Sequence, residues 1–215
     1  MADIKKLQKK YQDLLDKDYP EFVIGVDECG KGSWAGPMII CGMAWFPWHQ
    51  LPEMDDSKKL SRSKIRHVAN VLRLTTDIPW IMAIIKPEQI DRDGIEDAWH
   101  QGVAHVIQML RLKYDEHGSL AVVDGNKLPK YDAGPGKVVA MPKADSYCPA
   151  VQAAAIMAKN QQLQEMMMLD EMYPGYGFEE NAGYGTAAHR TALKKLGKCP
   201  AHRSTFRPMK DMKGG

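Results

Sequence analysis

An apolar run that ends in two adjacent acids and a glycine-rich turn, residues 22–37, constrains the fold most strongly. Residues 22–26 are short and apolar, a pattern typical of a buried strand. Asp27 and Glu28 follow, and because neighbouring side chains on a strand point to opposite faces, they cannot both enter one core. Three glycines come next: Gly30, Gly32 and Gly36. They let the backbone turn tightly and bring its amides close to a ligand, so the stretch predicts a cation site beside a phosphate-binding turn.

Two later apolar runs also end in an acid. Residues 120–125 end in Asp124 and a glycine, and residues 138–145 end in Asp145. Each acid taken alone has an ordinary explanation: a solvated strand end for Asp27 and Glu28, a turn-forming Asp-Gly for Asp124, and a helix start for Asp145. Ligands of open α/β sheets collect at the carboxyl ends of the strands, so we expect the four carboxylates to converge.

Four like charges held close together require bound cations or retained protons. Oxygen ligands without histidine or cysteine favour Mg²⁺ or Mn²⁺ over zinc. Two such ions, about 3.5–4 Å apart, support in-line attack on a phosphodiester. The acids therefore predict a two-metal site for cleavage of nucleic acid, whereas the chain has no GxSxG motif of an acyl-transfer hydrolase.

The hydrophobic periodicity predicts an α/β fold with a mixed sheet. We expect strands at 22–26, 38–46, 80–86, 120–125 and 138–145, and helices at 3–17, 61–72, 95–114 and 186–196, with an alanine-rich helix after Ser146. Ser61 and Ser146 are candidate N-caps, and Gly197 is a candidate helix stop.

Composition and charge limit the class of protein. The 215 residues are most simply one domain, with 44% hydrophobic and 26% charged residues. No apolar run is long enough for a membrane span, and residues 1–17 lack the apolar region of a secretory signal. The four scattered cysteines predict free thiols and a cytoplasmic protein.

The charge is unevenly distributed although the net charge is only +2. Residues 183–215 contain eight Lys or Arg and one acid. Such a tail is a candidate contact for a polyanion, and a solubilising tail is the alternative. His189 and His202 lie in this region, where they are expected to bind phosphate or to make structural hydrogen bonds.

Several ordered motifs together resemble type 2 ribonuclease H (ribonuclease HII). They are Gly25-Val26-Asp27-Glu28-Cys29-Gly30-Lys31-Gly32, Ala35-Gly36-Pro37, Asp56-Ser57-Lys58-Lys59-Leu60, Val123-Asp124-Gly125, Lys143-Ala144-Asp145-Ser146, the alanine-rich helix to Ala158-Lys159, residues 173–178, Gly183-Tyr184-Gly185-Thr186, and His202-Arg203 with Phe206. The resemblance spans residues 22–207. It implies a ribonuclease H-like fold, a mixed five-stranded sheet flanked by helices with a helical C-terminal extension.

The resemblance also implies an activity: cleavage of RNA in RNA–DNA hybrids and 5′ of single ribonucleotides in duplex DNA, leaving 3′-hydroxyl and 5′-phosphate ends. The four metal ligands of the family fall on Asp27, Glu28, Asp124 and Asp145. The backbone that senses the 2′-hydroxyl falls on Gly30-Lys31-Gly32, and glycine allows that close approach. The junction-reading tyrosine falls on Tyr184, for which a packed core ring is the alternative. Weaker candidates for phosphate contacts are Lys31, Lys58, Lys59 and Arg203.

Two residues depart from the pattern. Lys31 stands where type 2 members usually have arginine, and lysine there is commoner in type 3 enzymes, which act mainly on longer hybrids. Cys29 replaces a small alanine, for which we expect a packing role, although a thiol there could be oxidised. Three other readings stay open: a type 3-like enzyme, a non-catalytic hybrid-binding module, and another nuclease of the same fold such as a resolvase or integrase.

The predicted organisation is a single domain, residues 1–215. It comprises an N-terminal helix in 1–20, a catalytic core in 22–172 and a basic helical region in 173–215. The expected partners are RNA–DNA hybrids and ribonucleotide-containing DNA. We expect a monomer without a clear sliding-clamp motif and without a membrane association.

Overall fold

The computed structural model describes residues 4–18, 20–49, 60–74, 78–114 and 119–212. Its five-stranded sheet has the order β3-β2-β1-β4-β5. The strands are β1 (Val23–Cys29), β2 (Met38–Trp45), β3 (Trp80–Ile85), β4 (Leu120–Asp124) and β5 (Lys137–Met141). β1 pairs antiparallel with β2 and parallel with β4, so the sheet is mixed, as the sequence predicts.

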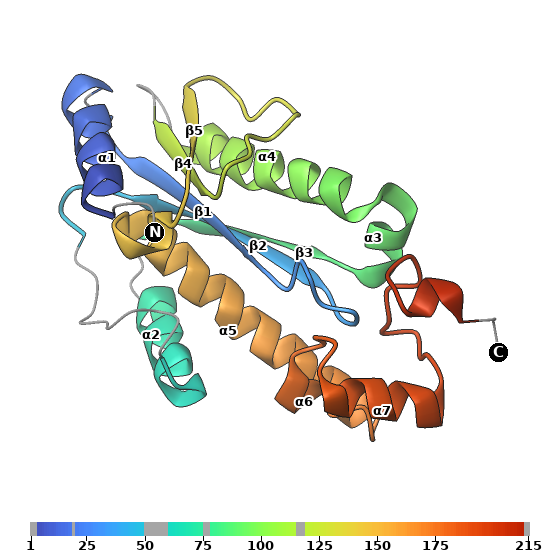
Figure 1. Cartoon of the computed structure of the whole chain (residues 1–215). Helices are drawn as coiled ribbons and strands as arrows, with labels where there is room; N and C mark the ends of the chain where they lie inside the picture. Colours follow the sequence, from blue (N-terminus) through green and yellow to red (C-terminus); the bar gives the residue numbers. More distant parts are fainter. Residues whose placement is uncertain (1–3, 19, 50–59, 75–77, 115–118, 213–215) are drawn as a thin grey trace.

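Helices flank the sheet on both faces (Figure 1). The α-helices are α1 (Ile4–Asp18), α2 (Arg62–Leu74), α3 (Pro87–Asp93), α4 (Ile95–Tyr114), α5 (Pro149–Met172), α6 (Phe178–Asn181) and α7 (Ala187–Leu196). Two short 3₁₀ helices, η2 (Ala144–Ser146) and η3 (Met209–Asp211), complete the described elements. Within these ranges, no helix combines the length and the apolarity needed to cross a membrane.

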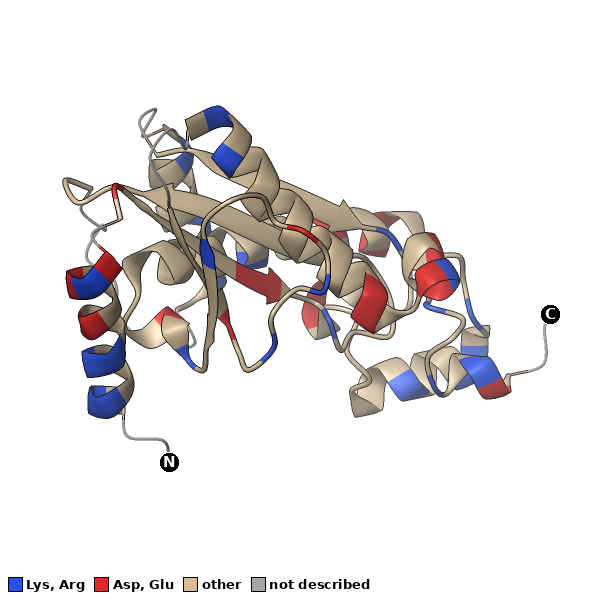
Figure 2. Ribbon diagram, turned by 90° about the horizontal axis from the view of Figure 1, so that it is seen from above, with Lys and Arg blue, Asp and Glu red and all other residues tan. Residues whose placement is uncertain are grey.

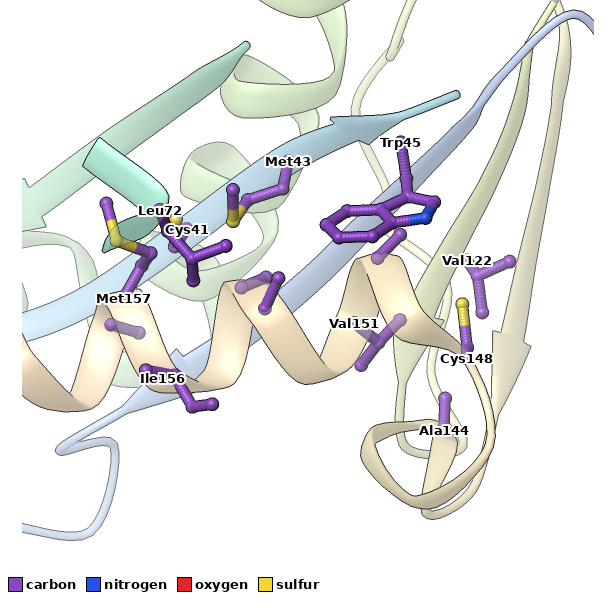
Figure 3. Packing of buried hydrophobic residues seen from close by; sticks show 14 of the residues in the cluster. Cys41, Met43, Trp45, Leu72, Val122, Ala144, Cys148, Val151, Ile156 and Met157 are labelled. Carbon is purple, nitrogen blue, oxygen red and sulfur yellow. The ribbon is translucent and has the colours of Figure 1, made fainter. Parts of the chain in front are cut away.

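The face of the sheet covered by α5 and α2 buries the first core cluster. Cys41 and Met43 of β2 pack there with Val151 and Met157 of α5, as Figure 3 shows. The helix lies so close to β1 that a Cβ on Gly25 would fall 2.1 Å from the carbonyl carbon of Ala150. Only glycine allows this approach, which brings the small-residue face of α5 against the strand that carries the acid pair.

The opposite face packs against α4. Ile24 and Val26 of β1 contact this second cluster, together with Val103 and Ile107 of α4. Because side chains alternate along a strand, residues 24, 26 and 28 of β1 face α4, while residues 23, 25, 27 and 29 face α5. The acid pair is therefore divided between the two faces.

A third cluster forms the C-terminal extension beyond α5. Phe178, Tyr176 and Leu193 are buried there, and the rings of Tyr176 and Phe178 stack at 5.1 Å between centroids. Figure 1 shows α6 and α7 at the far end of α5. The predicted helical extension is confirmed.

The local predictions agree with the structure in most places. α4 has the predicted bounds, Ser61 caps α2 by accepting from the Lys64 amide at 3.3 Å, and Gly197 ends α7. Ser146 is an exception, because it lies within η2 and α5 begins after Cys148. The four cysteines are free thiols, as expected.

Candidate active site

Parallel pairing of β1 and β4 brings two of the predicted acids together. Val26 pairs with Val123, so the next residue on each strand, Asp27 and Asp124, are neighbours across the ladder. Neighbouring strands lie about 4.8 Å apart, and equivalent positions in a parallel register face the same side of the sheet. Both carboxylates therefore lie on the α5 face at the carboxyl edge of the sheet.

Asp145 reaches the site by a different route from the predicted one. β5 ends at Met141, so Asp145 is not at a strand end; it lies in η2, after Lys143 turns the chain with a left-handed φ of 57°. The amide of Ala144 donates to Oδ1 of Asp124 at 2.7 Å, which ties η2 to the end of β4. Asp145 then lines the same pocket as Asp27 and Glu28.

Glu28 approaches the pocket from the α4 side. The indole Nε1 of Trp99 on α4 donates to Oε2 of Glu28 at 3.0 Å. The same ring lies 4.5 Å from the ammonium of Lys31, which also pairs with Glu96 at 3.1 Å. Trp99 thus supports both an acid and a cation of the site.

The four acids interact electrostatically. Burial first, and then the charges of Asp124, Glu28 and Asp145, raise the pKa of Asp27 well above its usual value. Burial also raises the pKa of Glu28, while the Trp99 hydrogen bond and the charge of Lys31 lower it. Such a group of partly buried carboxylates fits hard divalent cations, although among the described residues no three carboxylate, histidine or cysteine groups are already arranged as ligands.

The glycine-rich turn lies beside the acids and is held from behind. Gly30 has a left-handed φ of 82°. Arg203 donates from Nη2 to the carbonyl of Gly30 at 2.7 Å, from Nη1 to that of Lys31 at 2.8 Å, and from Nε to that of Gly36 at 3.1 Å. The arginine fixes the shape of the turn that was expected to sense a 2′-hydroxyl.

This placement corrects the expectation that Arg203 binds phosphate. Its side chain is completely buried, and its nitrogens are occupied by backbone carbonyls. Sequence reasoning found the residue but gave it the wrong partner. Lys58 and Lys59, the other weak candidates, lie outside the described residues.

Tyr184 stands at the open side of the turn. The residue is 39% exposed, and a Cβ on Gly32 would lie 3.8 Å from the Cε1 atom of its ring. A ring in this position is available to a ligand above Gly32, which disfavours the alternative of a packed core tyrosine.

Two buried histidines lie in a chain of hydrogen bonds that ends at the backbone carbonyl of Tyr184. Nδ1 of His189 lies 3.0 Å from the Tyr184 carbonyl oxygen. Nε2 of His189 lies 3.1 Å from Nε2 of His202. The amide of Cys199 donates to Nδ1 of His202 at 3.0 Å. These contacts are satisfied together when His202 donates from Nε2 to His189, and His189 donates from Nδ1 to the carbonyl. Because both rings are buried, the structural interpretation holds and phosphate binding by this pair does not.

Two residues of the site were missed as functional candidates. Lys159 of α5 lines the pocket and donates to Oε1 of Gln162 at 3.0 Å, and Trp99 of α4 donates to Glu28. The thiol of Cys29 also contacts Oε1 of Gln162, at 3.0 Å, and burial raises its pKa to about 11. A thiol that keeps its proton fits the expected packing role better than an oxidisable one.

In the order of the sheet, two antiparallel strand pairs are followed by two parallel pairs, and acids lie at neighbouring strand ends. This arrangement defines the ribonuclease H-like class of fold. Residues 24–209 match the family model described as Ribonuclease HII. The chain therefore belongs to the ribonuclease HII family and is a ribonuclease H, a phosphodiester hydrolase.

Individual relatives agree with the family model. A ribonuclease HII of Hyphomonas neptunium is 36% identical over 198 residues, covering 87% of this chain and 94% of that protein. The structure of the complex of PCNA with RNase HII from Archaeoglobus fulgidus superposes with a TM-score of 0.67 at 26% identity, covering 89% of this chain and all of that one. Bst-RNase HIII in complex with Mn²⁺ shares the fold, with a TM-score of 0.68 at 18% identity over 88% of this chain and 68% of that one.

Proposed function

We propose that this ribonuclease H incises DNA duplexes 5′ of single embedded ribonucleotides and also cuts the RNA strand of RNA–DNA hybrids. The observation that carries the proposal is the position of the Gly30–Gly32 turn. The turn follows the paired acids Asp27 and Asp124 along the edge of the sheet, Arg203 holds it, and Tyr184 stands on its open side. One nucleotide can therefore contact the acids and the turn at once.

Asp27, Glu28, Asp124 and Asp145 would hold the divalent ions, Mg²⁺ or Mn²⁺. The chemistry of these donors supports this, since carboxylate oxygens suit hard cations, and a structure of Bst-RNase HIII contains Mn²⁺. When bound, a pair of such ions activates water and stabilises the leaving oxygen of the phosphodiester. A 3′-hydroxyl and a 5′-phosphate result when water attacks the phosphorus opposite the 3′-oxygen and the bond between phosphorus and the 3′-oxygen breaks.

The protein's own groups would choose the scissile position. The 2′-hydroxyl is the atom that distinguishes RNA from DNA at one nucleotide, and glycine lets the amides of Gly30 to Gly32 approach it. The ring of Tyr184 would rest against the next sugar and disfavour a second 2′-hydroxyl there. The ammonium of Lys31 is shared between Glu96 and Trp99, so it would contribute a positive charge more than a directed phosphate contact.

The decisive experiment is incision of a DNA duplex that carries one ribonucleotide, with Mg²⁺ or Mn²⁺, and mapping of the cut at nucleotide resolution. We expect a single cut on the 5′ side of the ribonucleotide. Activity only on uniform hybrids would overturn the single-ribonucleotide part and make the enzyme type 3-like. Binding without cutting in either metal would indicate a hybrid-binding module, and preferential cutting of a four-way junction would indicate a resolvase-like nuclease.

Two expectations about assembly stay predictions. The protein is expected to act as a monomer. Because its C-terminal sequence shows no clear sliding-clamp motif, it is not expected to bind a sliding clamp strongly. The Archaeoglobus fulgidus relative forms a complex with PCNA. Sedimentation of the purified protein, alone and with the sliding clamp of its own host, tests both expectations.

A further inference from the structure

A second pocket lies in the C-terminal extension, lined mainly by residues of α7 and of the segment that follows it. It has a volume of about 500 Å³. Its lining combines three basic residues with an aromatic ring and aliphatic side chains: Arg190, Lys194, Arg207, Trp34, Leu193 and Met212. Pro208 completes the wall.

The charges of this pocket are of one sign. None of the residues that line it is acidic. Asp211 pairs with Arg207 at 3.4 Å, but both side chains of that pair are largely exposed, so the pair is weak and open to exchange. In Figure 2, Lys and Arg recur along the part of the chain that leads to the C-terminus. The pocket therefore favours an anionic ligand with an apolar part.

Trp34 joins this pocket to the candidate active site. Its amide donates to the carbonyl of Gly183 at 2.7 Å, and a Cβ on Gly185 would fall 2.3 Å from its ring. Tyr184 lies between these two glycines. Trp34, which lines the pocket, therefore packs on the loop that carries Tyr184.

Cations grouped around an aromatic ring are a recurrent way of holding a nucleic-acid strand. The cations follow the phosphates, while the ring packs against a base or sugar. Arg190 already lies over the Trp34 ring, with 5.3 Å between the guanidinium carbon and the ring centroid. It is therefore positioned to join a phosphate contact to the stacked surface.

We propose that this pocket binds the sugar–phosphate backbone of the substrate strand that flanks the scissile position. Lys194, Arg190 and Arg207 contact phosphates, and Trp34 with its aliphatic neighbours packs against a sugar or base. The inference rests on the proposed function, because it assumes that the strand passes Tyr184. It adds a contact that determines how much flanking duplex the enzyme needs.

The test uses neighbouring lysines of α7 as a matched pair. Lys194 lines the pocket, whereas Lys195 does not, and both are exposed. Binding of the full chain to labelled DNA duplexes with one ribonucleotide is measured without divalent metal, with long flanks and with flanks trimmed progressively on each side. We expect Lys194→Glu to weaken binding of the long duplex about tenfold and Lys195→Glu to change it less than twofold. The effect of Lys194→Glu should disappear once one particular flank is trimmed.

A second pair repeats the comparison without charge reversal. Arg207→Ala should lower the slope of log affinity against log salt by about one, as expected for loss of one phosphate contact, while Lys210→Ala should not. Thermal unfolding of each variant checks that the fold is intact. Equal losses for the pocket variant and its control, no loss for either, or a loss independent of flank length would overturn the proposal.

The outcomes separate this inference from the proposed function. If the wild-type protein cuts 5′ of a ribonucleotide but the pocket variants bind normally, the pocket assignment fails and the function stands. If no cut occurs and the flank-dependent binding difference persists, the function fails. Normal DNA binding by Lys194→Glu together with loss of a sliding-clamp interaction would assign the pocket to a protein partner and overturn the nucleic-acid assignment.

Discussion

The indole of Trp99 donates a hydrogen bond of 3.0 Å to Glu28, although 71 residues separate them in the chain. Trp99 is 3% exposed and belongs to the core between α4 and the sheet. A proposed metal ligand is thus oriented by a residue fixed in the hydrophobic core. The arrangement limits the freedom of Glu28 at the edge of the pocket without adding a charge to it.

Trp99→Phe should reduce activity more than stability. Phenylalanine retains most of the apolar packing but cannot donate to Glu28, and a hydrogen bond to a charged group contributes about 1.5–3 kcal/mol. We expect kcat to fall about tenfold and the Mn²⁺ concentration needed for half-maximal activity to rise. Steady-state cleavage over a Mn²⁺ titration measures both. Trp80→Phe, at an edge-strand tryptophan that is 37% exposed, is the control, and an equal effect there would refute the assignment.

Removing one charge from the acid cluster should stabilise the metal-free protein. Burial and the neighbouring carboxylates raise the pKa of Asp27, so its ionised form costs free energy in the folded state. The raised pKa means that the protonated carboxyl favours the folded state. This contribution to stability is complete below pH 3.8, the ordinary pKa of an aspartate, and is lost as pH rises through the raised pKa of the folded state. At neutral pH we therefore expect Asp27→Asn to raise Tm by about 2–4 °C, corresponding to about 1 kcal/mol, and to abolish cleavage.

The metal dependence of the same variant gives a second readout. Mg²⁺ should raise the Tm of the wild-type protein and should raise that of Asp27→Asn by less. Differential scanning fluorimetry with and without EDTA measures this. Asp13→Asn on the exposed side of α1 is the control, and it should change neither the Tm nor the response to Mg²⁺. A metal-free Asp27→Asn protein less stable than wild type would contradict the repulsion argument.

Arg203→Lys should destabilise the fold. A lysine cannot reproduce the guanidinium contacts with three backbone carbonyls, and each carbonyl left without a partner in a buried site costs about 1–3 kcal/mol. We expect a loss of about 2–4 kcal/mol in urea unfolding. A phosphate-binding arginine would behave in the opposite way, with salt-dependent loss of substrate affinity and unchanged stability. Arg66→Lys, at an exposed arginine of α2, is the matched control and should leave stability unchanged.

The sequence predicted the fold best where one strong local pattern decides the structure. Helix α4 was located by its apolar stripe, and Asp27 and Asp124 by short apolar runs that end in acids. Asp145 was assigned to a strand end because nothing in a single sequence reveals that Lys143 adopts a left-handed turn and starts a 3₁₀ helix.

Partners that are distant in the chain were the main limit on predicting the site. Arg203 contacts Gly30 across 173 positions, and whether an arginine near a basic tail faces phosphate or carbonyl oxygens depends on burial that composition does not encode. Trp99 shows the same limit, since nothing near it in the chain identifies Glu28 as the acceptor of its N–H group. The residue types of the site were readable from sequence, whereas the orienting contacts required the tertiary structure.

The histidine pair predicts a loss of stability in mild acid. Burial, and then the charge of His189, lower the pKa of His202 to about 4, and burial also lowers the pKa of His189. The folded state therefore keeps both rings neutral, and its stability is fully present above the ordinary histidine pKa of 6.5. As pH falls from 6.5 towards 4, the unfolded chain binds protons that the folded chain does not, so stability decreases.

His202→Asn should reduce the slope of unfolding free energy against pH in this window by up to one proton, whereas His105→Asn on the exposed side of α4 should not. Urea unfolding at pH 7.5, 6 and 5 measures the slopes. Because the pair supports the carbonyl of Tyr184, cleavage by the wild-type protein should fail in acid before global unfolding, and equal slopes for wild type and His202→Asn would contradict this role.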